Sequence, residues 1–251
     1  MKKQGRASNR PAFFVASRET FGIHGLQKSC NHVSLHTMII SQGRNYIFVH
    51  IPKTGGTSMA LALEGRAKKD DILIGDTPKA LKRRHRVKNV QTAGRLWKHS
   101  TLQDIDGLVS VAQMATAFTF TMVRNPWDRL VSYYHWLQTQ TFDHPAVHLA
   151  ERVDFSEFLN APQTRASISA HPYGSYMRSP NGKEYCNAFI RLEHFQNDAQ
   201  PLWDHLGFEL DLSHENASDR ENDYRTYYTE CDSNLVKTLC SEDIARFGYQ
   251  F

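Results

Sequence analysis

The stretch Tyr46-Ile-Phe-Val-His-Ile-Pro-Lys-Thr-Gly-Gly-Thr-Ser58 decides how the rest of the chain is expected to fold. Its opening residues are apolar and favour β structure, which predicts a buried strand of a parallel sheet. The pair Gly55 and Gly56 permits the backbone angles of a tight loop. Thr57 and Ser58 are suitable N-cap residues for the helix that the next residues predict. Such a unit directs backbone N–H groups and a positive dipole end at one point, where an anion such as a phosphate would bind.

The position of Lys53 separates this loop from the ATPase phosphate loop. That motif, Gly-x-x-x-x-Gly-Lys-Ser/Thr, has its lysine after the glycines, whereas Lys53 precedes them. A lysine at the loop entrance would reach the outer end of the bound group, near the atom being transferred. An ordinary strand-turn-helix unit, in which Lys53 has no chemical role, is the alternative interpretation.

A second strand-loop-helix unit is predicted around Arg124. Residues 117–123 form an apolar run typical of a buried strand, and Asn125 and Pro126 suit the N-cap and first position of a helix. Ligands of α/β sheets bind at the carboxyl ends of strands, so Arg124 could grip a phosphate there, and Ser132 could face the same pocket. A capped core helix is the alternative. Apolar residues repeat along this helix with the spacing of a buried face: Trp127, Leu130, Val131, Tyr134 and Leu137.

Strands and helices alternate along the rest of the chain. A third strand is predicted at 189–192, and helices at 99–107, 198–206 and 234–247, whereas 161–183 is predicted to be a long loop. This alternation predicts a three-layer α/β fold with a mostly parallel sheet, built on a strand-turn-helix unit like that of phosphate-loop proteins. Three further segments are predicted: a short strand at 71–76, a basic connector at 78–98 that is helical in its first half, and a helical region at 143–160 with breaks near Pro145 and Asp154.

The composition is that of a globular protein with a full core. The chain has 251 residues, 40% of them hydrophobic, which suits one large domain or at most two small ones. Its apolar runs are shorter than the roughly 20 residues of a membrane span. The cysteines lie far apart and form no Cys-x-x-Cys pair, which argues against a zinc site and favours a reducing compartment, the cytoplasm. They are Cys30, Cys186, Cys231 and Cys240.

The first 37 residues are polar and basic and lack the apolar core of a secretory signal. We interpret residues 1–37 as a disordered tail or an over-long gene prediction, with Met38 as the alternative start, and residues 38–251 as a single domain. Positive charge is concentrated further on. Between Arg66 and Lys98, eleven Lys or Arg and three Asp give +8, which leaves −4 for the rest of a chain whose net charge is +4. This segment indicates anionic ligands or a solvated basic surface.

The two loop motifs resemble those of sulfotransferases that use 3′-phosphoadenosine 5′-phosphosulfate (PAPS), most closely the carbohydrate-type branch. Residues 51–58 resemble the 5′-phosphosulfate loop of that family, and residues 124–132 resemble its 3′-phosphate-binding element. The resemblance covers roughly residues 44–251, although 161–183 shows no matching motif. Its other matching segments are Phe189–Phe195, Asn216–Ser218, Tyr224–Tyr228 and Asp243–Tyr249.

This resemblance implies sulfuryl transfer from PAPS to an acceptor hydroxyl, on a carbohydrate, with no metal and no nucleic acid involved. Lys53 would stabilise the leaving phosphate, as charge-stabilising groups do in phosphoryl transfer. Arg124 and Ser132 would hold the 3′-phosphate. The 5′-phosphosulfate would be held by Lys53, Thr54, Gly55, Gly56, Thr57 and Ser58.

A general base must accept the proton of the acceptor hydroxyl, and a histidine with a pKa near neutrality suits this role. His99 stands where the carbohydrate sulfotransferases place their catalytic histidine. A helix-start histidine without chemistry is the alternative interpretation. Asp104 and Glu193 are alternative or supporting bases, whereas His50 and His135 are interpreted as structural.

Two other functions compete with sulfuryl transfer. A nucleotide kinase is disfavoured by the position of Lys53 and by the arginine that follows the second strand, where a metal-binding Asp would be needed. A nucleic-acid-binding module would use the basic segment and would bind tightly but with strong salt dependence. The sequence leaves open whether the acceptor is a sugar, lipid, peptide or small molecule, and what the oligomeric state is.

Overall fold

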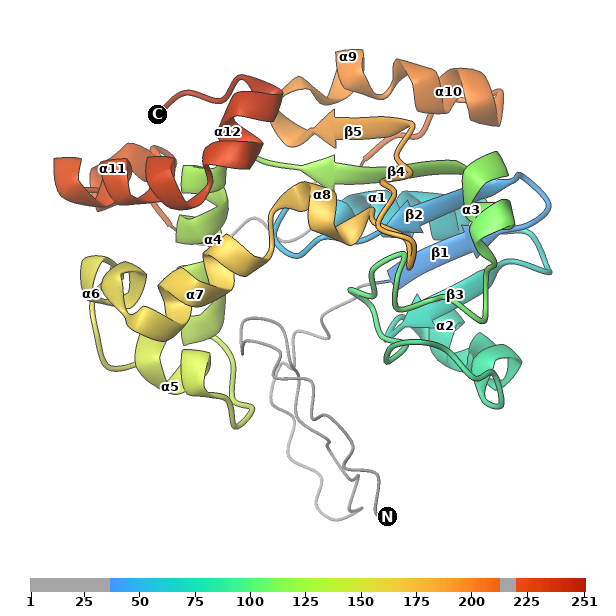
Figure 1. Ribbon diagram of the computed structural model, residues 1–251, viewed down its shortest axis with the longest axis horizontal. Helices are drawn as coiled ribbons and strands as arrows, with labels where there is room; N and C mark the ends of the chain where they lie inside the picture. The colour runs from blue at the N-terminus through green and yellow to red at the C-terminus, as the bar shows by residue number, and fades with distance from the viewer. Residues whose placement is uncertain (1–36, 213–219) are drawn as a thin grey trace.

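The computed structural model describes residues 37–212 and 220–251 of the chain (Figure 1). Within these residues, a five-stranded sheet has the order β3-β1-β2-β4-β5. β2 pairs in parallel with β4, and β4 with β5, whereas β1 is antiparallel to both β2 and β3. Four strands therefore point one way and only β1 is reversed, which confirms the predicted mostly parallel sheet. The strands are β1 (Thr37–Ser41), β2 (Tyr46–Val49), β3 (Ile72–Gly75), β4 (Phe118–Val123) and β5 (Ala188–Arg191).

The sequence analysis missed β1, which lies inside the sheet between β3 and β2. The strand is short and fully buried, so it lacks the alternating pattern that reveals a half-exposed strand. Thr37 has no exposed surface, and its hydroxyl donates to Glu64 Oε1 at 2.8 Å. The ordered sheet therefore includes Thr37, one residue before the predicted domain boundary; the remaining part of the predicted tail lies outside the described residues.

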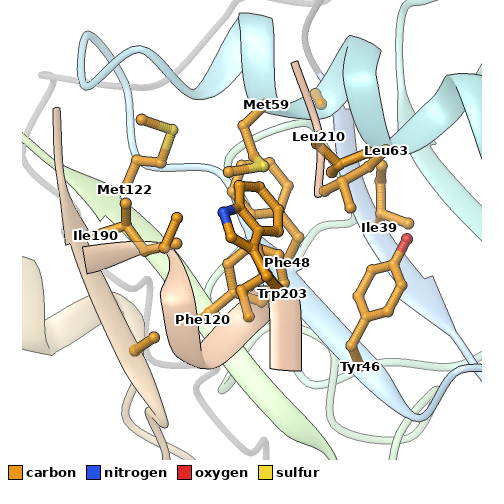
Figure 2. Close-up of a cluster of buried hydrophobic side chains, with 14 of the residues drawn as sticks. Ile39, Tyr46, Phe48, Met59, Leu63, Phe120, Met122, Ile190, Trp203 and Leu210 are labelled. Atoms are coloured by element: carbon orange, nitrogen blue, oxygen red, sulfur yellow. The ribbon is translucent and has the colours of Figure 1, made fainter. Parts of the chain in front are cut away.

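Helices cover both faces of the sheet. Because strand side chains alternate, Phe48 points to one face of β2 while Ile47 and Val49 point to the other. On the first face, Phe48 packs with Met59 of α1 (Gly56–Gly65) and Trp203 of α10 (Gln200–Leu206), as Figure 2 shows. The other face is covered by the turns at 101–109, α3 (Val111–Thr116) and α8 (Tyr173–Tyr176). The predicted three layers are thus present.

A second, purely helical core lies beside the sheet, at the left of Figure 1. Its central helix is α4 (Pro126–Gln138), whose predicted apolar face is buried. The predicted helix breaks near Pro145 and Asp154 are confirmed, because each residue begins or caps a separate short helix. The surrounding helices are α5 (Pro145–Ala150), α6 (Phe155–Asn160), α7 (Pro162–Ala170) and α11 (Glu230–Leu239).

Three predictions of secondary structure were wrong. Residues 99–107 form turns, not a helix, and the nearby helix is α3, which follows a capping box at Ser110. The predicted loop at 161–183 contains α7 and α8, because Pro162 starts α7 at its first position and does not interrupt it. The C-terminal helix is divided into α11 and α12 (Ser241–Phe247).

The predicted strand at 71–76, the helical start of the basic connector and the helix ended by Gly207 are confirmed. None of the described helices is both long and apolar enough to cross a membrane. The remaining elements are α2 (Pro78–Arg83), η2 (Arg84–Val87), η3 (Leu192–His194), α9 (Phe195–Asp198) and η4 (Tyr224–Tyr227).

Candidate active site

The loop between β2 and α1 has the geometry of an anion site. α1 begins at Gly56, and its N-cap is Gly55, which has a φ of 82° and therefore the left-handed conformation that glycine adopts without strain. The predicted N-caps Thr57 and Ser58 lie inside the first turn instead. No side chain caps this helix end and its first turn contains no acidic residue. The N–H groups of the first turn are thus directed toward the loop without a side-chain cap.

At both glycines an added side chain would collide with a neighbouring side chain. A Cβ on Gly55 would come within 2.7 Å of Leu192 Cδ1, and a Cβ on Gly56 within 2.4 Å of His50 Cδ2. The loop is also held from within, because the Thr54 hydroxyl donates to the Ile51 carbonyl at 2.8 Å. The Thr54 hydroxyl proton is therefore used inside the loop, so the backbone N–H is the donor that Thr54 can direct to a ligand.

Lys53 occupies a strained and electrostatically unusual position. Its φ of 65° is uncommon outside glycine and typical of functional loops. Its Nζ lies 5.5 Å from the centroid of the Trp136 ring. Burial, together with the nearby guanidinium groups of Arg124 and Arg220, lowers the pKa of Lys53 to about 7. An anion bound here would gain a positive partner with little competing solvent.

Arg124 and Arg220 are joined by one carboxylate. Nε and Nη2 of Arg124 each lie 2.7 Å from Asp128 Oδ2, and Arg220 Nη2 contacts Oδ1 of the same carboxylate. Arg124 Nη1 also lies 3.5 Å from the Lys53 carbonyl oxygen. The structure therefore places two arginines on one carboxylate beside Lys53, and the surplus of positive charge favours a phosphate-bearing ligand.

One face of α4 lies along this loop. Arg129 Nε donates to the Pro52 carbonyl at 3.0 Å, and Trp136 contacts Lys53. Ser132 lies between these two positions with the spacing of one helix face and is 4% exposed. Of the predicted pair, Arg124 thus lies just before α4, and Ser132 lies on the face of α4 that borders the loop.

The helix itself begins as predicted, since Asn125 caps α4 by accepting from the Trp127 N–H at 3.0 Å. This cap explains why the chain turns sharply after Arg124. The arginine remains at the end of β4, facing the loop, while the residues after it enter the helix.

His99 lies against the end of the strand that carries the loop. Its Nδ1 is 2.8 Å from the His50 carbonyl oxygen, and because a carbonyl only accepts, Nδ1 carries the proton and Nε2 is the acceptor of the neutral ring. The two imidazole centroids are 4.8 Å apart. Burial, followed by the charges of His50 and Lys98, holds the pKa of His99 well below its usual value. The ring is therefore neutral. It lies in a turn and not at the predicted helix start.

The alternative bases are engaged in structural contacts. Asp104 Oδ2 accepts from the Thr101 N–H at 2.9 Å, and Glu193 Oε1 accepts from the Asn125 N–H at 2.6 Å. Burial lowers the pKa of His50 to about 3, which agrees with a structural role. Among the described residues, no group of three or more His, Cys, Asp or Glu side chains is arranged to hold a metal ion.

Two residues of the site were not singled out from the sequence. Trp136 follows Ser132 by four residues, so its position on the same helix face was a detectable signal. Arg220 had no such signal, because only the tertiary fold brings it to Asp128 and Lys53.

An anion loop at the carboxyl edge of a mostly parallel sheet, with arginines and a buried neutral histidine beside it, defines an enzyme that transfers a group from a phosphorylated donor. Residues 36–249 match the model of the sulfotransferase family, and the chain belongs to this family. The resemblance to PAPS-dependent sulfotransferases is therefore confirmed, and the protein is a sulfotransferase.

Among solved structures, the chain is similar to the crystal structure of mouse sulfotransferase SULT7A1 complexed with PAP. The identity is 15% and the TM-score 0.46, over 82% of this chain and 87% of that chain. No curated protein sequence matches the chain.

Proposed function

We propose that this enzyme transfers the sulfuryl group of PAPS to an acceptor hydroxyl, on a carbohydrate, with Lys53 and His99 as catalytic residues. The observation that carries the proposal is the convergence of three groups at the end of β2. Lys53 follows this strand, Arg124 reaches its loop, and His99 contacts the carbonyl group of His50, the residue directly after the strand.

The donor would be held at both of its phosphate groups. The N–H groups from Thr54 to Ser58 suit the 5′-phosphosulfate, because they include the uncapped first turn of α1. Arg124 and Ser132 suit the 3′-phosphate, and Arg220 adds positive charge beside them. This distribution of charge supports a nucleotide that carries phosphate at both the 3′ and the 5′ position.

The transfer would proceed in line between two oxygens. The acceptor oxygen forms a bond to sulfur while the bond between sulfur and the bridging phosphate oxygen breaks. The hydroxyl proton passes to Nε2 of His99, and the charge that develops on the leaving phosphate is stabilised by Lys53. The products are a sulfate ester and 3′,5′-ADP, and the proton later leaves His99 for solvent.

The carbohydrate acceptor is supported by the likeness of residues 51–58 to the carbohydrate-type branch. The scattered cysteines likewise support a reducing compartment, the cytoplasm, as the place of action. Assays that offer PAPS together with free sugars, phenols or lipid alcohols would test the acceptor class. Sulfation of only the non-sugar hydroxyls would contradict this part of the proposal.

Calorimetry tests the donor site. Wild-type protein in EDTA is expected to bind 3′,5′-ADP at least tenfold more tightly than 5′-AMP, because only the former engages Arg124 and Ser132. Arg124→Ala should remove most of this difference. Arg178→Ala, which removes an exposed arginine that pairs with Glu242, is the control and should bind like wild type. Equal affinities for the two nucleotides, or binding only of ATP with magnesium, would reject the donor assignment.

A further inference from the structure

We propose that the indole ring of Trp136 forms one wall of the acceptor subsite and selects a hydroxyl carried by a ring with a flat apolar face. The inference rests on the proposed function, because it takes Lys53 as the marker of the leaving oxygen. It adds a binding residue and a class of acceptor to that function.

The first argument is position. Lys53 Nζ lies 5.5 Å from the centroid of the Trp136 ring. If Lys53 contacts the oxygen from which the sulfuryl group departs, the attacking hydroxyl must stand about 3–3.5 Å from the sulfur on the opposite side. This spacing is of the same order as the 5.5 Å between Lys53 Nζ and the centroid of the Trp136 ring. The ring is therefore within reach of any acceptor that is correctly placed.

The second argument is that the ring is held in place. Trp136 lies 5.9 Å from the buried Tyr133 ring with an interplanar angle of 28°, and 6.1 Å from Phe142. Its backbone is fixed by α4, whose start is tied to the loop through Arg124 and Arg129. A half-buried aromatic ring that is packed against two neighbouring rings and lies beside Lys53 is a preorganised binding surface.

The third argument concerns Lys53. A tryptophan beside a lysine could serve only to hold the ammonium group through a cation–π contact. Burial lowers the pKa of Lys53 to about 7, so the free enzyme near neutrality contains much uncharged Lys53, for which this contact is weak. Phosphate oxygens are stronger partners for the ammonium than an aromatic ring. Donor binding would thus release the ring face for the acceptor.

The chemistry of the wall defines the acceptor. An indole face packs well on the apolar C–H face of a pyranose and on the ring of a phenol, whereas a flexible alkyl chain offers no flat surface. Sugars and phenols share this feature, so the test contains one of each. A linear alcohol serves as the comparison.

The experiment measures binding to the enzyme saturated with 3′,5′-ADP by saturation-transfer NMR, with methyl β-D-galactopyranoside, phenol and hexan-1-ol as probes. Wild type is expected to bind one of the ring compounds at least tenfold more tightly than hexan-1-ol. Trp136→Ala should abolish this preference, and Trp136→Phe should keep part of it. The control is Phe208→Ala, which removes another half-buried aromatic ring beside cationic side chains, in this case Arg44 and Arg66.

The outcomes separate the two proposals. Loss of ring-compound binding in Trp136→Ala, with unchanged affinity for 3′,5′-ADP, supports Trp136 as a wall of the acceptor subsite. The ring compound that binds to wild type identifies a sugar or a phenol as the acceptor class. Equal binding by wild type and Trp136→Ala, or no preference for a ring in wild type, overturns it. A selective loss of 3′,5′-ADP affinity in both Trp136 variants also overturns it, because Trp136 would then serve the donor side. Failure of wild type to bind 3′,5′-ADP would instead reject the donor proposal.

Discussion

At the scale of single residues, the site is dominated by the environment of Lys53. Taking its side chain out of water disfavours the ammonium form, and the two neighbouring arginines act in the same direction. Asp128 offsets part of this charge but is already bonded to both arginines. A dianionic ligand would supply the missing negative charge. Ligand binding and protonation of Lys53 are therefore expected to be coupled.

This coupling gives a pH dependence with a definite sign. In the free enzyme Lys53 loses its proton near pH 7, whereas beside a bound phosphate its pKa should rise. The complex then binds more protons than the free enzyme above pH 7, so the affinity for 3′,5′-ADP should fall as pH rises, by up to about tenfold per pH unit. Calorimetry between pH 7.5 and 9 measures this slope and, in buffers of different ionisation enthalpy, the proton uptake.

Lys53→Met is the control for this linkage, since it cannot be protonated. Its affinity for 3′,5′-ADP should stay nearly constant over the same pH range. A wild-type affinity that is independent of pH, without proton uptake, would show that Lys53 is not at the phosphate.

A second residue prediction concerns His99. His99→Ala should lower kcat by roughly 10²–10⁴, the usual contribution of a positioned base, while 3′,5′-ADP binding stays near wild type. Because burial keeps the pKa of His99 well below its usual value, the ring is neutral across the assay range. The pH–rate profile of the wild type should then show no rise from histidine deprotonation between pH 6 and 8. This differs from the near-neutral pKa of His99 expected from the sequence.

Steady-state kinetics of His99→Ala and of the exposed His148→Ala would test this role. The second variant should retain wild-type turnover. A folded His99→Ala enzyme with undiminished kcat would assign the base elsewhere, and Glu193 would be the next candidate.

At the scale of elements, the strand-loop-helix unit depends on close approach between the loop and its own strand. Gly56 begins α1 directly over the His50 ring, and a side chain there would have to displace a buried imidazole. Since the His50 carbonyl also accepts from His99, the same displacement would disturb the base. The absence of a side chain at Gly56 thus leaves room for the His50 ring, which also packs against the proposed base His99.

Gly56→Ala is therefore expected to weaken 3′,5′-ADP binding at least tenfold and to destabilise the fold by about 1–3 kcal/mol, the usual effect of overpacking. Gly65→Ala is a matched control at the other end of α1, where a Cβ would meet nothing within 4 Å. It should leave binding unchanged and maintain or slightly raise stability. Denaturant titration and calorimetry measure both effects, and wild-type binding by Gly56→Ala would contradict the described loop geometry.

At the scale of the whole molecule, the sheet is held together by β1, which pairs with β2 on one side and β3 on the other. We propose that a chain starting at Thr37 contains the complete folding unit. It should bind 3′,5′-ADP like the full chain. A chain starting at Gln42 lacks β1, so β3 loses its sheet partner and the core cluster on the first face of the sheet loses Ile39.

Thermal unfolding followed by circular dichroism would compare the two truncated chains. The expected result is a cooperative transition for the first and none for the second. If the chain starting at Thr37 failed to fold or to bind, residues 1–36 would belong to the folding unit.

The sequence alone determined the elements that local chemistry specifies. The apolar run at β2 and the paired glycines predicted the strand-loop-helix unit, and Asn125 followed by Pro126 predicted the start of α4, because caps and turns act within a few residues. Strongly amphipathic segments such as α4 were predictable for the same reason. Short buried elements such as β1 and α8 were missed, since their burial depends on neighbours that lie far away in the sequence.

Only the tertiary structure decided how the separate motifs form one site. It places His99 on the carbonyl of His50, and it brings Arg220 to the carboxylate that holds Arg124. It also lowers the pKa of Lys53 by burial. These features depend on distance, exposure to solvent and charge in three dimensions, and none of these quantities is carried by the local pattern of residues.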